Sequence, residues 1–167
     1  MLVALSSAQR AQTLSKISID NIVFGSRDVL IPVNSLLKHS TERTGLFSMH
    51  LKAYNVDDRI CVVECLKIYL KKTASIRGSE KQCFISFCKP FRAVSVDTIS
   101  RWLKRVLFEA GINVEIFKAH STRSAATSRA KLDGLSIDSI LKTAGWNNNR
   151  TFKKYYDKAI LIDQERE

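Results

Sequence analysis

The chain has 167 residues, 45% of them hydrophobic, which suits one compact domain with a core of its own. Its 27 Lys and Arg residues against 16 Asp and Glu residues give a formal net charge of +11 at pH 7, and this balance favours a polyanionic partner. No apolar run approaches the roughly 18–20 residues that a membrane span needs, and no signal peptide follows Met1, so we expect no membrane partner and a nuclear or cytoplasmic protein.

The four cysteines are Cys61, Cys65, Cys83 and Cys88. None belongs to a C-x-x-C pair and no histidine stands near them, so their spacing argues against a zinc site. Cys61 and Cys65 have apolar neighbours, which indicates buried, reduced thiols. We therefore expect no metal and no disulfide.

The first predicted element is a helix over 1–17, rich in Ala and Leu, that begins at the first residue. Three short segments follow, at 21–24, 28–33 and 46–51, with β-branched or alternating apolar residues and turn residues between them. This pattern predicts a small antiparallel sheet.

The middle of the chain contains two further apolar segments. Helical spacing of apolar residues predicts a helix over 59–72, which a polar loop ends. The run 83–87 is short and apolar and predicts a strand.

A capped amphipathic helix is predicted next. Ser95 is suited to the N-cap, apolar residues recur at helical spacing, with Trp102 among them in the core, and Gly111 ends the helix. The opposite face is basic and either is solvated or lies along DNA phosphates. Its cations are Arg101, Lys104 and Arg105.

The most informative stretch, 120–157, begins with an H-x-x-R pair. His120 and Arg123 are three residues apart, so they share one face in the first turn of a helix. Unpaired N–H groups and the helix dipole favour an anion there. The pair therefore predicts a phosphate-binding site.

A short amphipathic helix follows over 137–144, Gly145 is placed to end it, and Trp146 comes directly after. This corner is expected to aim Trp146 back toward the H-x-x-R pair. A second short helix, over 151–157, then presents the phenol of Tyr155 or Tyr156.

The ordered set of H-x-x-R, Gly-Trp and a tyrosine one helix later resembles the tyrosine recombinase and integrase family. Within it, the segments STRSAATSRA and AGWNNNRTFKKYYDK are most similar to DIRS-type and Crypton-type mobile elements of eukaryotes. The resemblance covers nearly the whole chain. It implies an α+β, mainly α-helical fold, that of a tyrosine recombinase catalytic domain, with a small antiparallel sheet near the N-terminus.

The resemblance also implies a domain organisation. Residues 1–167 are expected to be a single catalytic domain with a truncated N-terminal edge and no core-binding domain, and 159–167 is a tail.

The family's reaction implies a role for each matching residue. Arg10 is the first active-site arginine, and with Arg123 it offers planar forks to the phosphate oxygens. Lys38, at the turn between the second and third strands, is the expected general acid. His120 is the candidate base, and Trp146 donates its indole N–H to the phosphate.

The nucleophile is one of two adjacent tyrosines, and it would form a 3′-phosphotyrosyl link without a cofactor or metal. Tyr155 lies nine residues after Trp146, the spacing usual in bacterial and phage relatives. The eukaryotic mobile elements place tyrosine second in the pair, which favours Tyr156. Both remain candidates.

We therefore expect the catalytic domain of a site-specific DNA recombinase or integrase. Its partners would be double-stranded DNA and other recombinase protomers, with no small-molecule substrate. Two alternatives are an inactive, domesticated DNA-binding module and a basic protein-interaction domain that keeps the fold. A type IB topoisomerase would use the same groups.

Overall fold

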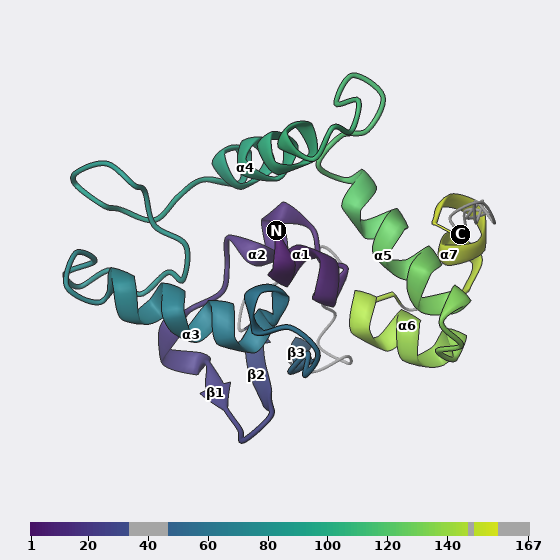
Figure 1. The fold of residues 1–167 in the computed structure, drawn as a ribbon, viewed down its shortest axis with the longest axis horizontal. Helices are drawn as coiled ribbons and strands as arrows, with labels where there is room; N and C mark the ends of the chain where they lie inside the picture. Colours follow the sequence, from purple (N-terminus) through teal and green to yellow (C-terminus); the bar gives the residue numbers. More distant parts are fainter. Residues whose placement is uncertain (34–46, 147–148, 157–167) are drawn as a thin grey trace.

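The computed structural model describes residues 1–33, 47–146 and 149–156. Its helices are α1 (Leu2–Ser7), α2 (Ala11–Leu14), α3 (Val62–Thr73), α4 (Val96–Glu109), α5 (Ser121–Leu132), α6 (Ile137–Ala144) and α7 (Asn149–Tyr155). Its strands are β1 (Val23–Phe24), β2 (Asp28–Val33) and β3 (Phe47–Lys52), and two short 3-10 turns are η1 (Ile19–Asn21) and η2 (Asp58–Ile60). Figure 1 shows α1 and α2 between the sheet and α4, with α5, α6 and α7 together on one side.

The sheet has the order β1-β2-β3 and both pairings are antiparallel. Val29 pairs with Leu51, and both are buried, whereas the next pair, Leu30 and His50, is exposed. This alternation is the period of two that a half-buried sheet requires. The predicted small antiparallel sheet is confirmed, although position 21 belongs to η1 instead of the first strand.

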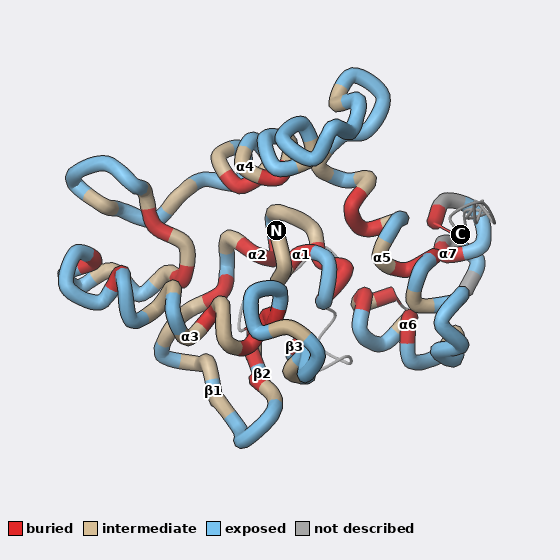
Figure 2. Tube along the Cα trace, viewed as in Figure 1, coloured by how far each residue is buried: buried red, intermediate tan, exposed pale blue. Residues whose placement is uncertain are grey.

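The main core lies between the sheet and helices α1 to α4. Figure 2 shows its buried segments meeting at the centre of the molecule, while the outer parts of the connections on either side of α4 are mostly exposed. Its buried members are Ala4, Leu14, Ile17, Val29, Ile31, Val33, Met49, Leu51, Cys61, Val62, Val63, Leu66, Cys83, Ile99 and Leu103.

A second, smaller cluster joins α5, α6 and α7 to the end of α1. Its buried residues are Ala8, Ile140, Ala144, Trp146, Phe152 and Tyr156. Trp146 and Tyr156 have ring centroids 4.5 Å apart, and the Trp146 and Phe152 centroids are 5.8 Å apart. These contacts pack α7 and Tyr156 against the corner that follows α6.

The single helix predicted over 1–17 is wrong, because the chain forms two helices with a break at Ala8. Ala8 has φ 51° and ψ 30°, the left-handed conformation, and ends α1. Arg10 has φ −77° and ψ 154° and is the N-cap of α2. The cause is tertiary: Ala8 is buried in the second cluster, and that position requires the chain to turn.

The predicted strand at 83–87 is also wrong, since only an isolated bridge between Ile85 and Ala93 forms there. The backbone donors of this run find separate partners: Cys83 N–H donates to Ile17 O and Ile85 N–H to the hydroxyl of Tyr69. Scattered partners leave no continuous ladder. The apolar character of the run reflects burial of Cys83 and Ile85.

The other helix predictions are confirmed, with small shifts at the ends. Ser95 Oγ accepts from Thr98 N at the start of α4, and Gly111 has φ 76° just beyond its end. The helix predicted over 59–72 begins three residues later, as α3, because η2 occupies its expected first turn. Trp102 is only half-buried and stacks on Phe87, so it lies at the edge of the core.

The four cysteines are free thiols. Cys61 is buried as expected and Cys65 is partly buried. Within the described residues, no helix is both long and apolar enough to cross a membrane.

Candidate active site

The H-x-x-R pair lies at the start of α5, as predicted. His120 is the N-cap of this helix, and Arg123 follows within its first turn. Arg123 is only 2% exposed, although it carries a guanidinium group. Its Nη2 donates to the carbonyl oxygen of Ala144 at 2.7 Å, which ties α5 to the end of α6.

The surroundings of the Arg123 guanidinium are aromatic. Its central carbon lies 4.3 Å from the ring centroid of Trp146 and 5.5 Å from that of Tyr156, within the range of cation–π attraction. Nε of Arg123 is buried and has no hydrogen-bond partner, and no carboxylate in the described part of the chain pairs with this side chain. The site thus holds a buried cation with a donor left open.

Burial lowers the pKa of Arg123 to about 10, the charge of Arg10 contributes in the same direction, and Tyr156 opposes the shift. This value is still well above neutral pH, so the guanidinium remains charged. A buried, unpaired charge is costly unless an anion compensates it. The arrangement is therefore suited to an anionic ligand.

The imidazole of His120 contacts the phenol of Tyr156. Its Nε2 lies 2.7 Å from the Tyr156 hydroxyl, and the rings meet edge to face. Burial lowers the pKa of His120, and the charges of Arg123 and Arg10 lower it further. A neutral imidazole can accept the proton of a phenol, so the pair has the geometry of a base and its nucleophile.

The backbone of Tyr156 is hydrogen-bonded through both its N–H and its carbonyl group. This residue follows α7 directly and is buried, and its backbone N–H donates to Phe152 O. Its carbonyl oxygen accepts from Ser128 Oγ at 2.7 Å, so α5 fixes the backbone that carries the phenol. The side chain of Tyr155 lies outside the described residues.

Arg10 is brought to the same place from the start of α2. It lines a cavity of about 230 Å³ together with His120 and Arg123, and its charge lowers the pKa of both. Ser100 and Leu103 of α4 also line this cavity. Two guanidinium groups and one imidazole therefore converge on one space.

Trp146 is placed by the corner after α6. Gly145 adopts the left-handed conformation at φ 67°, and Trp146 N–H then donates to Leu141 O. The Trp146 indole Nε1 is buried and has no hydrogen-bond partner. With Arg123 Nε, it makes a second unsatisfied donor in the cluster around Tyr156.

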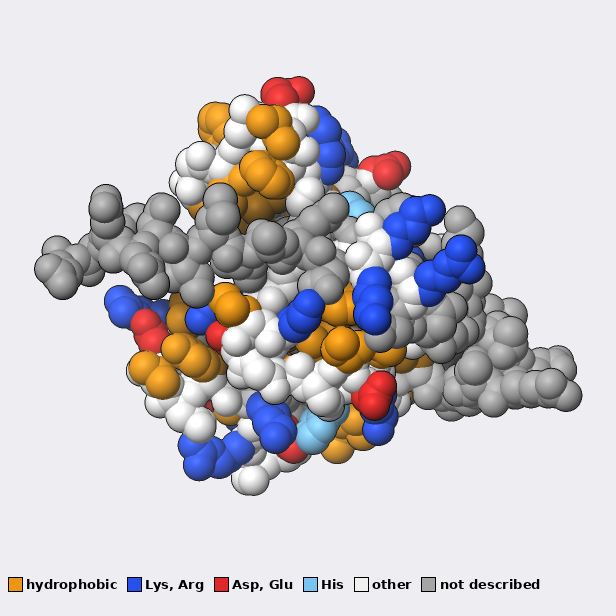
Figure 3. All heavy atoms as spheres, turned by 90° about the vertical axis from the view of Figure 1, so that its right-hand side faces the viewer, with side chains coloured by type: hydrophobic (Ala, Val, Ile, Leu, Met, Phe, Trp, Pro, Cys, Tyr) orange, Lys and Arg blue, Asp and Glu red, His pale blue; other side chains and the backbone are white. Residues whose placement is uncertain are grey.

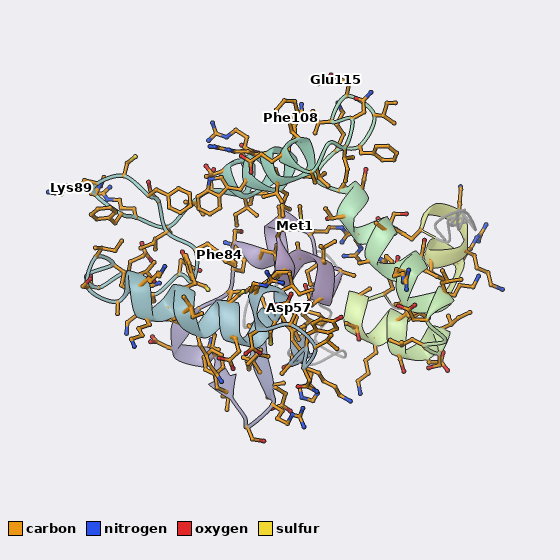
Figure 4. All side chains as sticks on the ribbon, viewed as in Figure 1. Met1, Asp57, Phe84, Lys89, Phe108 and Glu115 are labelled. Atoms are coloured by element: carbon orange, nitrogen blue, oxygen red, sulfur yellow. The ribbon has the colours of Figure 1, made fainter. Side chains whose placement is uncertain are left out.

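The remaining candidate residues are Lys38 and the three cations of α4. Lys38 lies outside the described residues. The three α4 cations have partners on the protein: Arg105 Nε donates to Glu109, Lys104 Nζ to Glu115, and Arg101 Nη2 to Thr98 Oγ1. In Figure 4, Phe108 lies on the upper side of α4 and Glu115 in the connection that follows it, both away from α6 and α7. A DNA contact by the α4 cations stays a prediction.

Two polar residues near the site were not identified from the sequence. Gln9, next to Arg10, is buried and donates to Thr143 O at 2.8 Å. Ser128 is one of several small residues on α5, and such a run indicates that neighbouring elements pack closely against the helix. Nothing in the local pattern marks Gln9.

Metal-ligating residues do not gather in the described part of the chain: no group of three or more His, Cys, Asp and Glu side chains could hold an ion. On the side of the molecule formed by α5 to α7, Figure 3 shows Lys and Arg side chains spread over the surface. Such a surface is suited to a polyanion.

Residues 1–160 match the Phage integrase family. Among solved structures, XerA recombinase is 19% identical over 96% of this chain and 50% of that one, with a TM-score of 0.73. XerH recombinase bound to difH substrate is 13% identical over 91% of this chain and 40% of that one, with a TM-score of 0.69. A lambda integrase dimer bound to a COC′ core site is 19% identical over 99% and 52%, with a TM-score of 0.57.

The chain spans about half the length of these structures or less. At such identities the likeness concerns the fold, and it confirms the predicted tyrosine recombinase catalytic-domain fold. Among curated proteins, no sequence matches the chain.

Proposed function

Because the chain belongs to the phage integrase family, we propose that it is the catalytic domain of a site-specific DNA recombinase or integrase. The observation that carries the proposal is the contact of 2.7 Å between His120 Nε2 and the Tyr156 hydroxyl, beside the buried and unpaired Arg123. The contact supplies a nucleophile with its base. The cation supplies a place for the phosphate that the nucleophile attacks.

The reaction would proceed by direct attack on phosphorus. The Tyr156 oxygen forms a bond to the scissile phosphorus as the proton of the phenol passes to neutral His120. The bond from phosphorus to the 5′ oxygen breaks, and the 3′-phosphotyrosyl link keeps the strand ready for rejoining. The leaving 5′ oxygen takes up a proton, for which Lys38 remains our proposed donor.

The two arginines and the indole would stabilise the transition state. Charge builds on the non-bridging oxygens during attack, and donors already aimed at that position need no reorganisation. Arg10 and Arg123 line the same cavity, and the buried Arg123 Nε and Trp146 Nε1 beside it have no acceptor on the protein. Removing one such donor typically costs about 10²–10³-fold in rate.

The partners follow from the same proposal. XerH was solved on its difH substrate, and lambda integrase was solved as a tetramer on a Holliday junction. We propose that this chain likewise binds double-stranded DNA and works with other protomers, with residues 1–167 as one catalytic domain. Its net charge of +11 supports a DNA partner.

We also propose that the chain derives from the DIRS-type or Crypton-type mobile elements of eukaryotes. The support is the amino-acid sequence of the segments STRSAATSRA and AGWNNNRTFKKYYDK, together with the tyrosine at the second position of the Tyr155-Tyr156 pair. In this lineage Tyr156 is the nucleophile.

The test is covalent capture on nicked duplexes. The protein is incubated with a pool of duplexes, randomised in sequence around a nick that lets the cleaved end escape, and denaturing electrophoresis then detects a protein–DNA adduct. We expect an adduct with the wild type and with Tyr155→Phe, and none with Tyr156→Phe.

The two tyrosine variants also show which part of the proposal is wrong if the expected result is not obtained. An adduct lost only in Tyr155→Phe would assign the reaction to the other phenol. A salt-sensitive gel shift without adduct in any variant would indicate a binding module that does not cleave.

A further inference from the structure

The last turn of α6 has four carbonyl groups without partners inside the helix, as every helix end does. Two are satisfied locally, since Trp146 N–H donates to Leu141 O and Gly145 N–H to Lys142 O. The other two accept from distant parts of the chain. Thr143 O accepts from Gln9 Nε2 at 2.8 Å, and Ala144 O accepts from Arg123 Nη2 at 2.7 Å.

Gln9 is placed where it controls the backbone of Arg10. It is 4% exposed, and its backbone N–H and side-chain amide also contact Ser7. Its neighbours are the left-handed Ala8 and the extended Arg10 at the start of α2. With so short a link between two helices, fixing Gln9 fixes the point from which the Arg10 side chain leaves the backbone.

Arg10 needs such help, because its side chain has no anchor of its own. In residues 1–33, 47–146 and 149–156, no group accepts a hydrogen bond from its guanidinium, whereas Arg123 is held directly by Ala144. Arg10 is half-exposed and lies near a second positive charge. Repulsion between the two guanidinium groups therefore favours movement of Arg10 toward solvent.

We propose that Gln9 is a positioning residue for strand cleavage: its bond to Thr143 O holds Arg10 in register with Arg123 on a single helix end. The inference rests on the proposed function, since the shared ligand of the two arginines is taken to be the scissile phosphate. The negative end of the α6 dipole faces both attachments and offsets part of the repulsion. The last turn of α6 thus sets the distance between the guanidinium groups of Arg10 and Arg123.

The test compares Gln9→Met, which keeps the length of the side chain and removes its donor, with Thr73→Ala. Thr73 is also buried and hydrogen-bonded, to Tyr69 O, but it lies on α3 in the main core. Single-turnover cleavage is measured at saturating protein, and DNA affinity by gel shift. We expect Gln9→Met to cleave about 10–100-fold more slowly, because small misplacements of catalytic groups are costly, with affinity nearly unchanged. Thr73→Ala should change neither quantity.

A second readout does not depend on cleavage. The groups facing His120 are Arg10 from α2, Arg123 from α5 and the Tyr156 hydroxyl after α7. If Gln9→Met releases Arg10, the pKa of His120 measured by NMR titration should rise toward its ordinary value. Arg10→Ala should produce the same rise, and adding Gln9→Met to it should produce no more.

The two proposals fail in different ways. Wild-type cleavage and an unchanged His120 titration in Gln9→Met would overturn the positioning role and leave the recombinase proposal standing. If the wild type never forms an adduct, the recombinase proposal fails, and the titration alone decides whether Gln9 positions Arg10. If Gln9→Met does not fold, Gln9→Asn keeps the amide and shortens its reach by one methylene.

Discussion

Among the described residues two arginines are buried, Arg77 near the main core and Arg123 beside the second cluster, and their hydrogen bonding differs. Arg77, at 8% exposure, donates to the carbonyl oxygens of Gln82 and Cys83 and to the hydroxyl of Thr73. Arg123, at 2% exposure, has one protein acceptor and an Nε without a partner. The first guanidinium has three acceptors on the protein and holds a loop to α3. The second keeps hydrogen-bonding capacity for something that is not part of the chain.

The largest expected effect comes from exchanging each of these arginines for Met. Arg123→Met should reduce adduct formation by about 10²–10³-fold or more, because it removes a donor to the transition state. Its free energy of unfolding should fall by no more than about 1 kcal/mol, since loss of a buried, unpaired charge offsets the lost bond to Ala144. Denaturant unfolding and single-turnover cleavage measure the two quantities.

Arg77→Met is the matched control and should show the opposite pattern. It leaves buried acceptors unsatisfied, so we expect a loss of about 2–4 kcal/mol in stability and normal cleavage by the folded fraction. The comparison breaks down if Arg123→Met unfolds the protein while Arg77→Met does not.

The next effect concerns the second open donor of the small cluster. Trp146→Phe removes the indole N–H and keeps most of the ring, so cleavage should slow by about 10–100-fold, the worth of one hydrogen bond to a charged oxygen. Trp102→Phe makes the same change on α4, where the ring stacks on Phe87. Equal rates for the two variants in the nicked-duplex assay would show that Trp146 only packs.

A smaller effect is expected at the corner that aims Trp146. Gly145→Ala should destabilise the protein by about 1–2 kcal/mol, because Ala resists the left-handed conformation. The added Cβ would also lie 3.3 Å from the ring of Phe47, so the ring or the turn must give by a few tenths of an ångström, and we expect slower cleavage as well. Gly134, at φ 85° after α5, has open space around it. Gly134→Ala should therefore lose stability, measured by thermal unfolding, without a change in rate.

The smallest effect is a displacement of the pH profile. His120 acts as a base only when neutral, so cleavage should rise with pH through the pKa of His120. Burial and the two arginine charges lower that pKa, and the midpoint should therefore lie below the ordinary value of about 6.5. Arg10→Ala removes one of these charges and should move the midpoint upward. A profile from pH 5 to 8 in which the midpoint stays in place would contradict the assignment.

Local signals explain which parts of the fold could be predicted. The ends of α4 and α6 were predictable because Ser95 and Gly145 are capping residues whose effect depends on their own backbone. The break at Ala8 was not, since neither Gly nor Pro marks it and its cause is packing against residues far along the chain. The apolar run at 83–87 resembled a strand because burial alone produces the same composition.

The site divides in the same way. His120, Arg123, Trp146 and Tyr156 form an ordered motif, and the structure brings all four together. The attachment of Gln9 to Thr143 joins residues separated by 134 positions, and no periodic pattern connects them. Side chains that perform chemistry are restricted in type and can be found by type, whereas a residue that holds them in place needs only a donor within reach.

The bond from Ser128 to the carbonyl of Tyr156 has one more consequence. It secures the phenol beside the imidazole and guanidinium of its own chain, so each copy contains its own set of these groups. Mixing a Tyr156 variant with a His120 variant should therefore not restore cleavage. Neither subunit could use the intact tyrosine or histidine of the other.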